Sequence, residues 1–174
     1  IALKISRGNK ILDIDITVGY LELLKPSPEQ NLKKGLTYKL FKGEWSKLPE
    51  FSSLNPIKSG SVKTPSAEMA EGEIADQYAL SFDGYLEIKE EGFYTFSLSS
   101  DDGSQFIIGE KLLINNDGLH SFMAIEGRIR LPKGTFPIRV TFFENSGDQK
   151  LELRYQGPGI KMQPIPEDVF FQKN

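Results

Sequence analysis

The chain has 174 residues, which is enough for one well-buried domain with an appendage. Its 16 glycines, 10 prolines and 11% aromatic residues favour strands and turns over helices. The net charge of -3 gives it no general attraction to nucleic acids or anionic membranes, and without cysteine it has neither disulfides nor thiolate metal sites. No apolar run is long enough to span a membrane, and no signal peptide opens the chain, which begins without Met inside a predicted strand. We therefore expect a fragment of a longer protein.

The first 25 residues form a β segment that differs from the rest. Residues 2–6 and 11–18 are predicted strands joined through Gly8-Asn9, and in the second strand polar and aliphatic side chains alternate. Residues 20–24 would extend the same sheet before Pro26 and Pro28 end it. Two or three strands cannot make a stable sandwich alone. We interpret residues 1–25 either as strands of a preceding Ig-like β-sandwich or as a segment that docks on the main domain, and residues 26–35 as a linker.

The main domain starts near Leu36 and is predicted to be all-β. A short strand at 37–41 precedes an irregular loop over 48–56 and a mostly polar connection over 58–73. We expect Trp45 and Phe51 to pack this loop onto the domain; stacking on a sugar is the second interpretation. Short strands separated by turn residues are then predicted at 78–82, 85–89, 93–98, 105–108, 111–114, 121–131, 136–143, 150–155 and 169–171, with one helical turn at 166–168. This spacing indicates an antiparallel sandwich or barrel.

Two adjacent carboxylates interrupt the strand pattern at residues 100–104. The composition around Asp101 and Asp102 is that of a hairpin turn. No basic residue lies nearby in sequence to neutralise both carboxylates, so a hard cation would satisfy them. The alternative is a solvated turn whose carboxylates cap backbone N–H groups. Asn116, Asp117 and His120 form a second polar cluster, which we expect near the same end of the domain.

Several short motifs occur together in one order. They are Gly84-Tyr85-Leu86, Gly92-Phe93-Tyr94-Thr95-Phe96, Ser100-Asp101-Asp102-Gly103-Ser104, Asn116-Asp117-Gly118-Leu119-His120, Pro137-Ile138-Arg139-Val140, Phe143-Glu144-Asn145, Gly157-Pro158-Gly159 and Gln163-Pro164-Ile165-Pro166. The combination resembles the protective-antigen-type, or PA-fourteen, lectin-like domain over residues 36–171. The opening Phe41-Lys42-Gly43-Glu44-Trp45 resembles the variant attached to secreted bacterial hexosaminidases and other glycan-degrading enzymes. The resemblance implies an antiparallel β-sandwich.

The resemblance also implies a calcium site. In adhesin members of the family, two adjacent aspartates joined by a cis peptide bind Ca²⁺ with an Asn from a second loop, and Asp101, Asp102 and Asn145 hold the matching positions here. Calcium accepts carboxylate, amide and carbonyl oxygens together, so backbone carbonyls of residues 146–149 would add ligands. Gln149 departs from the pattern, because sugar-binding adhesins carry an aromatic platform near that position.

The ligand-binding residues implied by the resemblance share a place at the calcium end of the domain: Asp101, Asp102, Asn116, Asp117, His120 and Gln149. For His120, the only histidine, we favour a structural role in which its ring staples the loop by hydrogen bonds.

No catalytic pattern is present in the sequence. No nucleophile elbow surrounds any serine, and the HExxH, Walker and dinucleotide-binding motifs are missing. Sequence neighbours in a tight turn are badly placed for glycoside hydrolysis, which needs two carboxyls facing one another across a bond. We expect a non-catalytic, calcium-assisted carbohydrate-binding module of a larger secreted glycan-degrading enzyme. The alternative is a structural spacer or protein-docking sandwich in which any ion only rigidifies loops.

The expected partners follow from this interpretation. They are a glycan and a covalently linked enzyme domain upstream, with no nucleic acid and no membrane insertion. The resemblance places the protein in a secreted, periplasmic or cell-surface location.

Overall fold

A computed structural model describes residues 2–7, 10–15, 24–28 and 31–174. Strands β1 (Ala2–Arg7) and β2 (Lys10–Asp15) pair antiparallel from Ala2↔Asp15 to Arg7↔Lys10 and form a two-stranded sheet of their own. These strands were predicted from the sequence, although the end of the second one and the predicted extension over residues 20–23 lie outside the described residues. The three 3₁₀ turns of the described chain are too short to cross a membrane.

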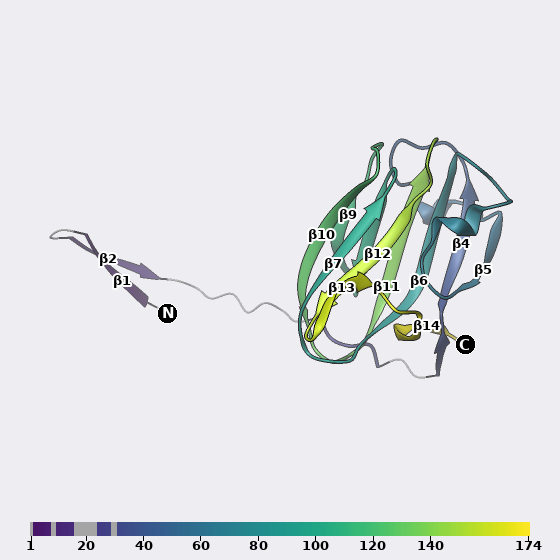
Figure 1. The fold of residues 1–174 in the computed structure, drawn as a ribbon. Coiled ribbons are helices and arrows are strands. Elements are labelled where there is room, and N and C mark those ends of the chain that lie inside the picture. Colours follow the sequence, from purple (N-terminus) through teal and green to yellow (C-terminus); the bar gives the residue numbers. More distant parts are fainter. Residues whose placement is uncertain (1, 8–9, 16–23, 29–30) are drawn as a thin grey trace.

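The rest of the described chain is an antiparallel β-sandwich (Figure 1), which confirms the predicted fold class. The smaller sheet has four strands in the order β10 (Met123–Leu131), β7 (Gly92–Ser100), β12 (Leu151–Gly157) and β13 (Ile160–Pro164). The larger sheet runs in the order β3 (Leu32–Lys34), β14 (Phe170–Lys173), β6 (Tyr78–Ile88), β11 (Gly134–Glu144), β8 (Ser104–Ile108) and β9 (Lys111–Asn116), and β4 (Leu36–Lys42) joins β5 (Lys58–Val62) to β6.

The core lies between the two sheets and is rich in aromatic side chains. Strand residues alternate between the two faces of a sheet, so every second residue of β7 and β11 points inward. Phe96 of β7 contacts Phe106 of β8 across the sandwich, with ring centroids 5.0 Å apart. Tyr94, Phe136 and Phe142 are also buried there.

The long loop after β4 packs on the outer face of the larger sheet, as predicted. Trp45, Leu48, Phe51 and Leu54 lie against a small buried cluster formed by Phe41, Ala79 and Phe143. Phe41 and Phe51 meet edge to face at 5.3 Å. This loop contains the 3₁₀ turn η1 (Phe51–Ser53), and a second turn, η2 (Ala67–Ala70), follows β5.

The structure corrects several predicted boundaries. Asp83-Gly84 is not a turn, because β6 continues through it: a Cβ atom on Gly84 would lie 2.4 Å from the carbonyl oxygen of Phe171. The glycine therefore permits close strand packing, which sequence alone does not distinguish from a turn. Strands β5 and β13 were not predicted, since their segments are mostly polar or exposed. The helical turn predicted at 166–168 is present as η3 (Glu167–Val169).

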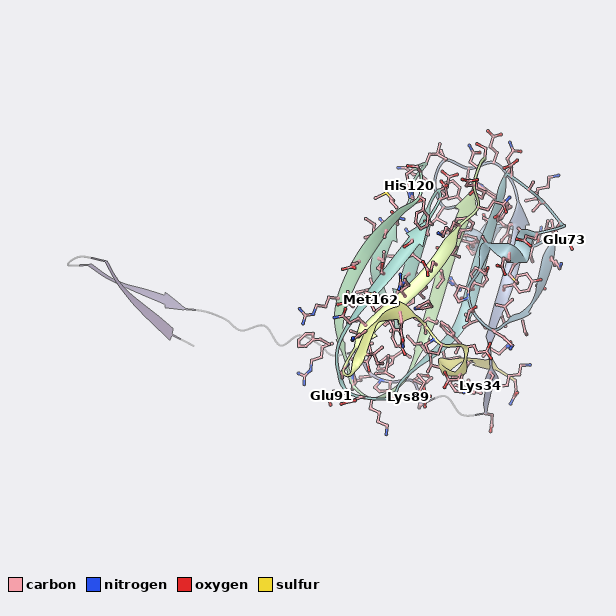
Figure 2. The ribbon with its side chains drawn as sticks, in the orientation of Figure 1. Lys34, Glu73, Lys89, Glu91, His120 and Met162 are labelled. Atoms are coloured by element: carbon pink, nitrogen blue, oxygen red, sulfur yellow. The ribbon has the colours of Figure 1, made fainter. Side chains whose placement is uncertain are left out.

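The segment interpreted as a linker makes contacts with the sandwich. The backbone N–H of Ser27 donates to the carbonyl oxygen of Thr135 at 2.7 Å, and β3 pairs with β14. The C terminus follows β14. Figures 1 and 2 show β14 and Lys34 at the end of the sandwich opposite His120.

Candidate functional site

Residues 100–104, here called the arch, cross from one sheet to the other. β7 ends at Ser100 and pairs with β10 and β12, whereas β8 starts at Ser104 and pairs with β11 and β9. The prediction of a hairpin tip is therefore wrong. A hairpin and an arch share the same turn chemistry, and only the long-range choice of strand partners separates them.

Buried hydroxyl groups hold the two ends of the arch together. Ser100 Oγ donates to the carbonyl oxygen of Asp102 at 2.7 Å, and lies 2.6 Å from Ser104 Oγ. Because a hydroxyl has one proton, Ser104 is the donor in the second bond. Asn116 Nδ2 also donates to Ser100 Oγ at 3.1 Å, so the strand after β8 is tied to the same point.

Asp102 joins three loops through its side chain and backbone. Its Oδ1 accepts from the N–H of His120 at 3.2 Å, and its Oδ2 accepts from the N–H of Asn145 at 2.9 Å. Its own N–H donates to the carbonyl oxygen of His120 at 2.9 Å. The side chain is buried, at 6% exposure, while Asp101 is half-buried.

The expected cis peptide between the two aspartates is not present. The Asp101–Asp102 bond is trans, and the chain changes direction instead through a positive φ of 53° at Asp102. Asp tolerates this left-handed region better than most residues. Four hydrogen bonds of Asp102 hold it there.

Glu144 is the site residue that sequence reasoning missed. It is the last residue of β11, 1% exposed, and neither of its carboxylate oxygens has a hydrogen-bond partner. Burial raises the pKa of Glu144 to about 8; repulsion from Asp102, Asp101 and Asp76 adds to the effect, and the nearby backbone N–H of Ser146 opposes it. The sequence contains one signal for this position, which is the alternation along β11. Every second residue of the strand is buried, and this series comprises Phe136, Ile138, Val140, Phe142 and Glu144. Glu144 therefore occupies a core-facing position.

Asn145, the next residue, supplies a second unpartnered acceptor. Its Oδ1 is buried without a hydrogen-bond partner, while its N–H is held by Asp102. A buried carboxylate or amide oxygen without a partner costs about 1–3 kcal/mol or more. Neither Asp101, Asp102 nor Glu144 forms an ion pair with any described residue. The arch therefore presents oxygen acceptors and no positive charge to balance them.

A calcium ion fits this set of donors. Carboxylate and amide oxygens are its preferred ligands, and it takes six to eight of them, including backbone carbonyls and water. Among the described residues, no group of three or more carboxylate or imidazole side chains is placed to hold a metal ion. An ion here would therefore take some of its ligands from amide, carbonyl or exogenous oxygens.

The remaining predicted site residues mainly connect loops. Asp117 Oδ1 accepts from the N–H of Leu48 at 2.7 Å and so anchors the long loop. Gln149 accepts from the hydroxyl of Tyr78 at 3.1 Å and donates to the carbonyl oxygen of Ala75. Both polar ends of Gln149 are thus used within the protein.

His120 lies at the arch end of the sandwich (Figure 2) and its ring is held between two carbonyl oxygens. Nδ1 lies 3.0 Å from the carbonyl oxygen of Ser121, and Nε2 lies 3.0 Å from that of Asn116. A neutral imidazole can donate only one of these bonds. These contacts agree with a structural role for the ring, next to the backbone that holds Asp102.

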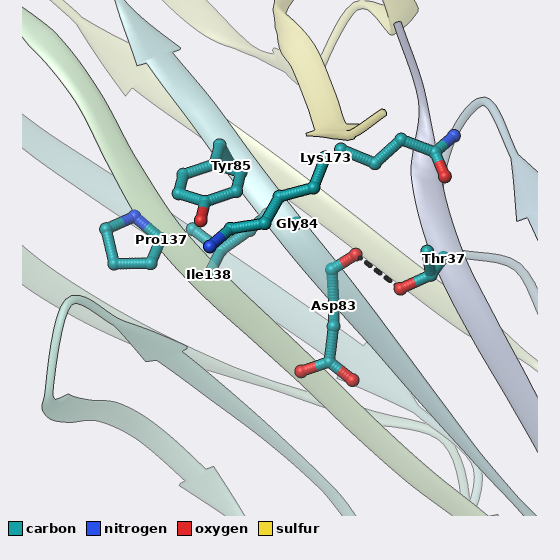
Figure 3. Close-up of a pocket in the computed structure, with 8 residues that line it drawn as sticks. Thr37, Asp83, Gly84, Tyr85, Pro137, Ile138 and Lys173 are labelled. Atoms are coloured by element: carbon teal, nitrogen blue, oxygen red, sulfur yellow. Dashed lines mark hydrogen bonds between the residues drawn. The ribbon is translucent and has the colours of Figure 1, made fainter. Parts of the chain in front are cut away.

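A depression on the outer face of the larger sheet has a different character (Figure 3). It is lined by residues of β4, β6, β11 and β14, and Thr37 Oγ1 donates there to the carbonyl oxygen of Asp83 at 3.1 Å. The Asp83 carboxylate is paired with Arg139 at 2.6 Å. Since these polar groups satisfy one another, the depression lacks the unpartnered acceptors that distinguish the arch.

Comparison with known structures shows the same fold in proteins of different kinds. An anti-sigma factor domain-containing protein from Clostridium clariflavum superposes with a TM-score of 0.67 at 17% identity, covering 94% of this chain and 54% of that one. The Epithelial Adhesin 9 A domain from Candida glabrata, in complex with Galβ1-3GlcNAc, gives 0.62 at 14% identity, covering 88% and 97%. A β-glucosidase from Kluyveromyces marxianus in complex with glucose gives 0.55 at 16% identity, covering 77% and 17%.

The chain thus spans about half of the first of these structures and a small part of the third. No curated protein matches the sequence. The family model of the PA14 domain matches residues 32–168, from β3 to η3, and confirms the resemblance drawn from the motifs. The chain belongs to the PA14 domain family.

Proposed function

We propose that this protein is a non-catalytic carbohydrate-binding module that binds glycans at the arch with the help of calcium. The observation that carries the proposal is the pair of adjacent residues Glu144 and Asn145, whose buried side-chain oxygens lack partners beside Asp102. Each unpartnered buried polar group in a native structure needs an explanation, and a bound ion or an ordered water supplies one.

The residues at the arch would have different roles in binding the ion. Asp101, Asp102 and Asn145 would hold the ion, with Glu144 adding negative charge from the buried side. The backbone bonds from His120 and Asn145 keep the Asp102 carboxylate oriented before any ligand arrives. Calcium, when bound, would supply a hard cation to which sugar hydroxyl oxygens can coordinate.

The comparisons support the choice of ligand and context. The adhesin domain was solved with a disaccharide bound, and the β-glucosidase carries this fold as a small part of a larger chain. We propose that this module likewise belongs to a larger secreted or surface-exposed enzyme acting on glycans.

Calorimetry tests the proposal directly. Calcium chloride titrated into the metal-free protein should give a Kd of about 0.1–1 mM, as is usual for extracellular calcium modules. Titration of methyl glycosides of mannose, galactose, glucose and N-acetylglucosamine should then give heat with calcium and none with chelator. Glycan heats that are equal with and without calcium would contradict the calcium-assisted mechanism.

One observation favours the second candidate, a structural spacer or docking sandwich. Asp102 caps two backbone N–H groups and Gln149 is used within the protein, so the arch already works as a junction between loops. If the protein is such a spacer, calcium should bind and raise the melting temperature, but no glycoside in the panel should give heat.

A further inference from the structure

The long loop after β4 covers only part of the outer face of the larger sheet, around Phe143. The part of this face that extends from Leu112 of β9 to Phe171 of β14 is here called the bare face. It contains two adjoining depressions with volumes of about 380 and 230 Å³, the first of which is the one in Figure 3. Both are lined by Asp83 and Pro137, so they form one continuous hollow.

The bare face is mainly apolar. Residues paired across neighbouring strands lie on the same face of a sheet, and the register pairs Leu112 with Ile107, Pro137 with Tyr85, and Tyr85 with Phe171. Leu112 is 47% exposed and the other four side chains are half-buried. Sheets in folded domains bury such faces against another layer. The bare face is therefore suited to receive one.

The N-terminal hairpin β1–β2 has a matching character. Its register pairs four aliphatic residues, which therefore share one face of the ladder: Leu3 with Ile14, and Ile5 with Leu12. The opposite face contains the pair of Lys4 and Asp13. A two-stranded hairpin is at best marginally stable by itself in water, so its aliphatic face needs a surface to pack on.

The chain joins the sandwich at the rim of the bare face. A Cβ atom on Gly109 would lie 3.1 Å from the side chain of Leu24, and Gly109 lines the smaller depression. Residues 16–23, which lie outside the described part of the chain, connect the hairpin to Leu24. Eight residues can reach at most about 28 Å. The hairpin is thus tethered within reach of the bare face.

We propose that the hairpin β1–β2 packs its aliphatic face on the bare face and forms a third layer of this domain. The dimensions agree: a strand of six residues is about 20 Å long, and five strands about 4.8 Å apart, from β14 to β9, extend over about 19 Å. In Figure 1 the hairpin and the sandwich stand apart, so each face is unpartnered there. Packing them together removes both apolar faces from water. The hairpin then continues the cover that the long loop provides.

Amide hydrogen exchange of the full chain tests this packing. Amides of the β1–β2 ladder should exchange at least a hundredfold more slowly than those of an unstructured chain, because docking suppresses local opening of the hairpin. Leu112→Asp puts a charge on the bare face and should accelerate this exchange at least tenfold. Phe93→Asp is the matched control, since Phe93 is 56% exposed on the smaller sheet, and it should leave the exchange unchanged.

The remaining outcomes are equally specific. The Val140 amide of the core strand β11 should exchange at the same slow rate in all three proteins, which shows that the sandwich stays folded. Hairpin amides that exchange at the unstructured rate in the natural sequence would overturn the proposal. Protection that Leu112→Asp does not change would also overturn it. So would protection that decreases on dilution, because the hairpin would then occupy the face of a second copy.

Discussion

The carboxylate of Asp102 and the backbone N–H of Asn145 form a 2.9 Å hydrogen bond between the arch and the loop after β11. The bond holds the backbone of Asn145 beside the arch, and the buried Oδ1 atom of Asn145 has no partner of its own. One aspartate therefore holds the loops together. The ligand-binding role that we propose falls on the same side chain.

Replacing Asp102 with Ala should separate these loops. The backbone N–H groups of His120 and Asn145 lose their acceptor, and hydrogen bonds to a charged group contribute about 1.5–3 kcal/mol each. We expect a lower melting temperature without calcium and no further rise when calcium is added, measured by calorimetric scanning. Asp168→Ala is the control, because it removes only an exposed pair with Lys89, and exposed ion pairs contribute little to stability. A normal calcium-dependent rise in Asp102→Ala would exclude Asp102 as a ligand.

Glu144 should make the metal-free protein less stable as the pH rises. Its pKa is raised from 4.5 to about 8 in the folded state, so between these values the folded protein binds more protons than the unfolded chain. The contribution of Glu144 to stability is therefore fully present below the pKa of the unfolded chain and is lost as the pH rises through the pKa of the folded protein. Each unit of difference between these two pKa values corresponds to about 1.4 kcal/mol of unfolding free energy. In chelator, the free energy of unfolding should decrease from pH 5 to pH 8.

Glu144→Gln isolates this contribution. The amide does not titrate, so the variant should show a smaller decrease over the same pH range, measured by urea unfolding at each pH. Added calcium should also reduce the decrease in the natural sequence, because an ion beside the carboxylate stabilises its charged form. Parallel pH curves for the two proteins would mean that Glu144 is not the group responsible.

The contrast between Glu144 and Asp102 shows how far the sequence could lead. The adjacent aspartates stand out because two carboxylates side by side are more than a turn requires. Glu144 was overlooked because it looks like an ordinary polar residue at a strand end. Its even spacing from Phe136 puts it on the core-facing side, but only the pairing of Glu144 with Tyr78 of β6 shows that the strand continues so far. Local alternation of side chains predicts where most strands lie. The arch, strand β13 and the continuation of β6 through Gly84 depend instead on contacts between residues far apart in sequence.

Gly84→Ala should test the reading of β6 as one continuous strand. A Cβ atom there would meet the Phe171 carbonyl oxygen at 2.4 Å and the Leu36 side chain at 2.5 Å. Relief of such overlap in a packed sheet requires backbone movement, and we expect a cost of about 2–3 kcal/mol in urea unfolding. Gly147→Ala is the comparison: nothing lies within 4 Å of its Cβ position, so only its φ of 114° opposes the change. Equal losses in the two variants would show that β6 has room for a side chain.

Asp117→Ala should loosen the long loop without disturbing the arch. The Asp117 carboxylate accepts the N–H of Leu48 at 2.7 Å, while the arch bonds of Asp102 do not involve it. Leu48, like Trp45 and Phe51, packs on the small buried cluster outside the main core. We therefore expect the loop to open locally while the sandwich stays folded. Amide hydrogen exchange at Leu48 should accelerate at least tenfold, with exchange at Asn145 unchanged, and calcium affinity should remain that of the natural sequence. Because Asp117 was predicted to bind ligand, a loss of glycoside affinity with slow exchange at Leu48 would instead assign it to the binding site.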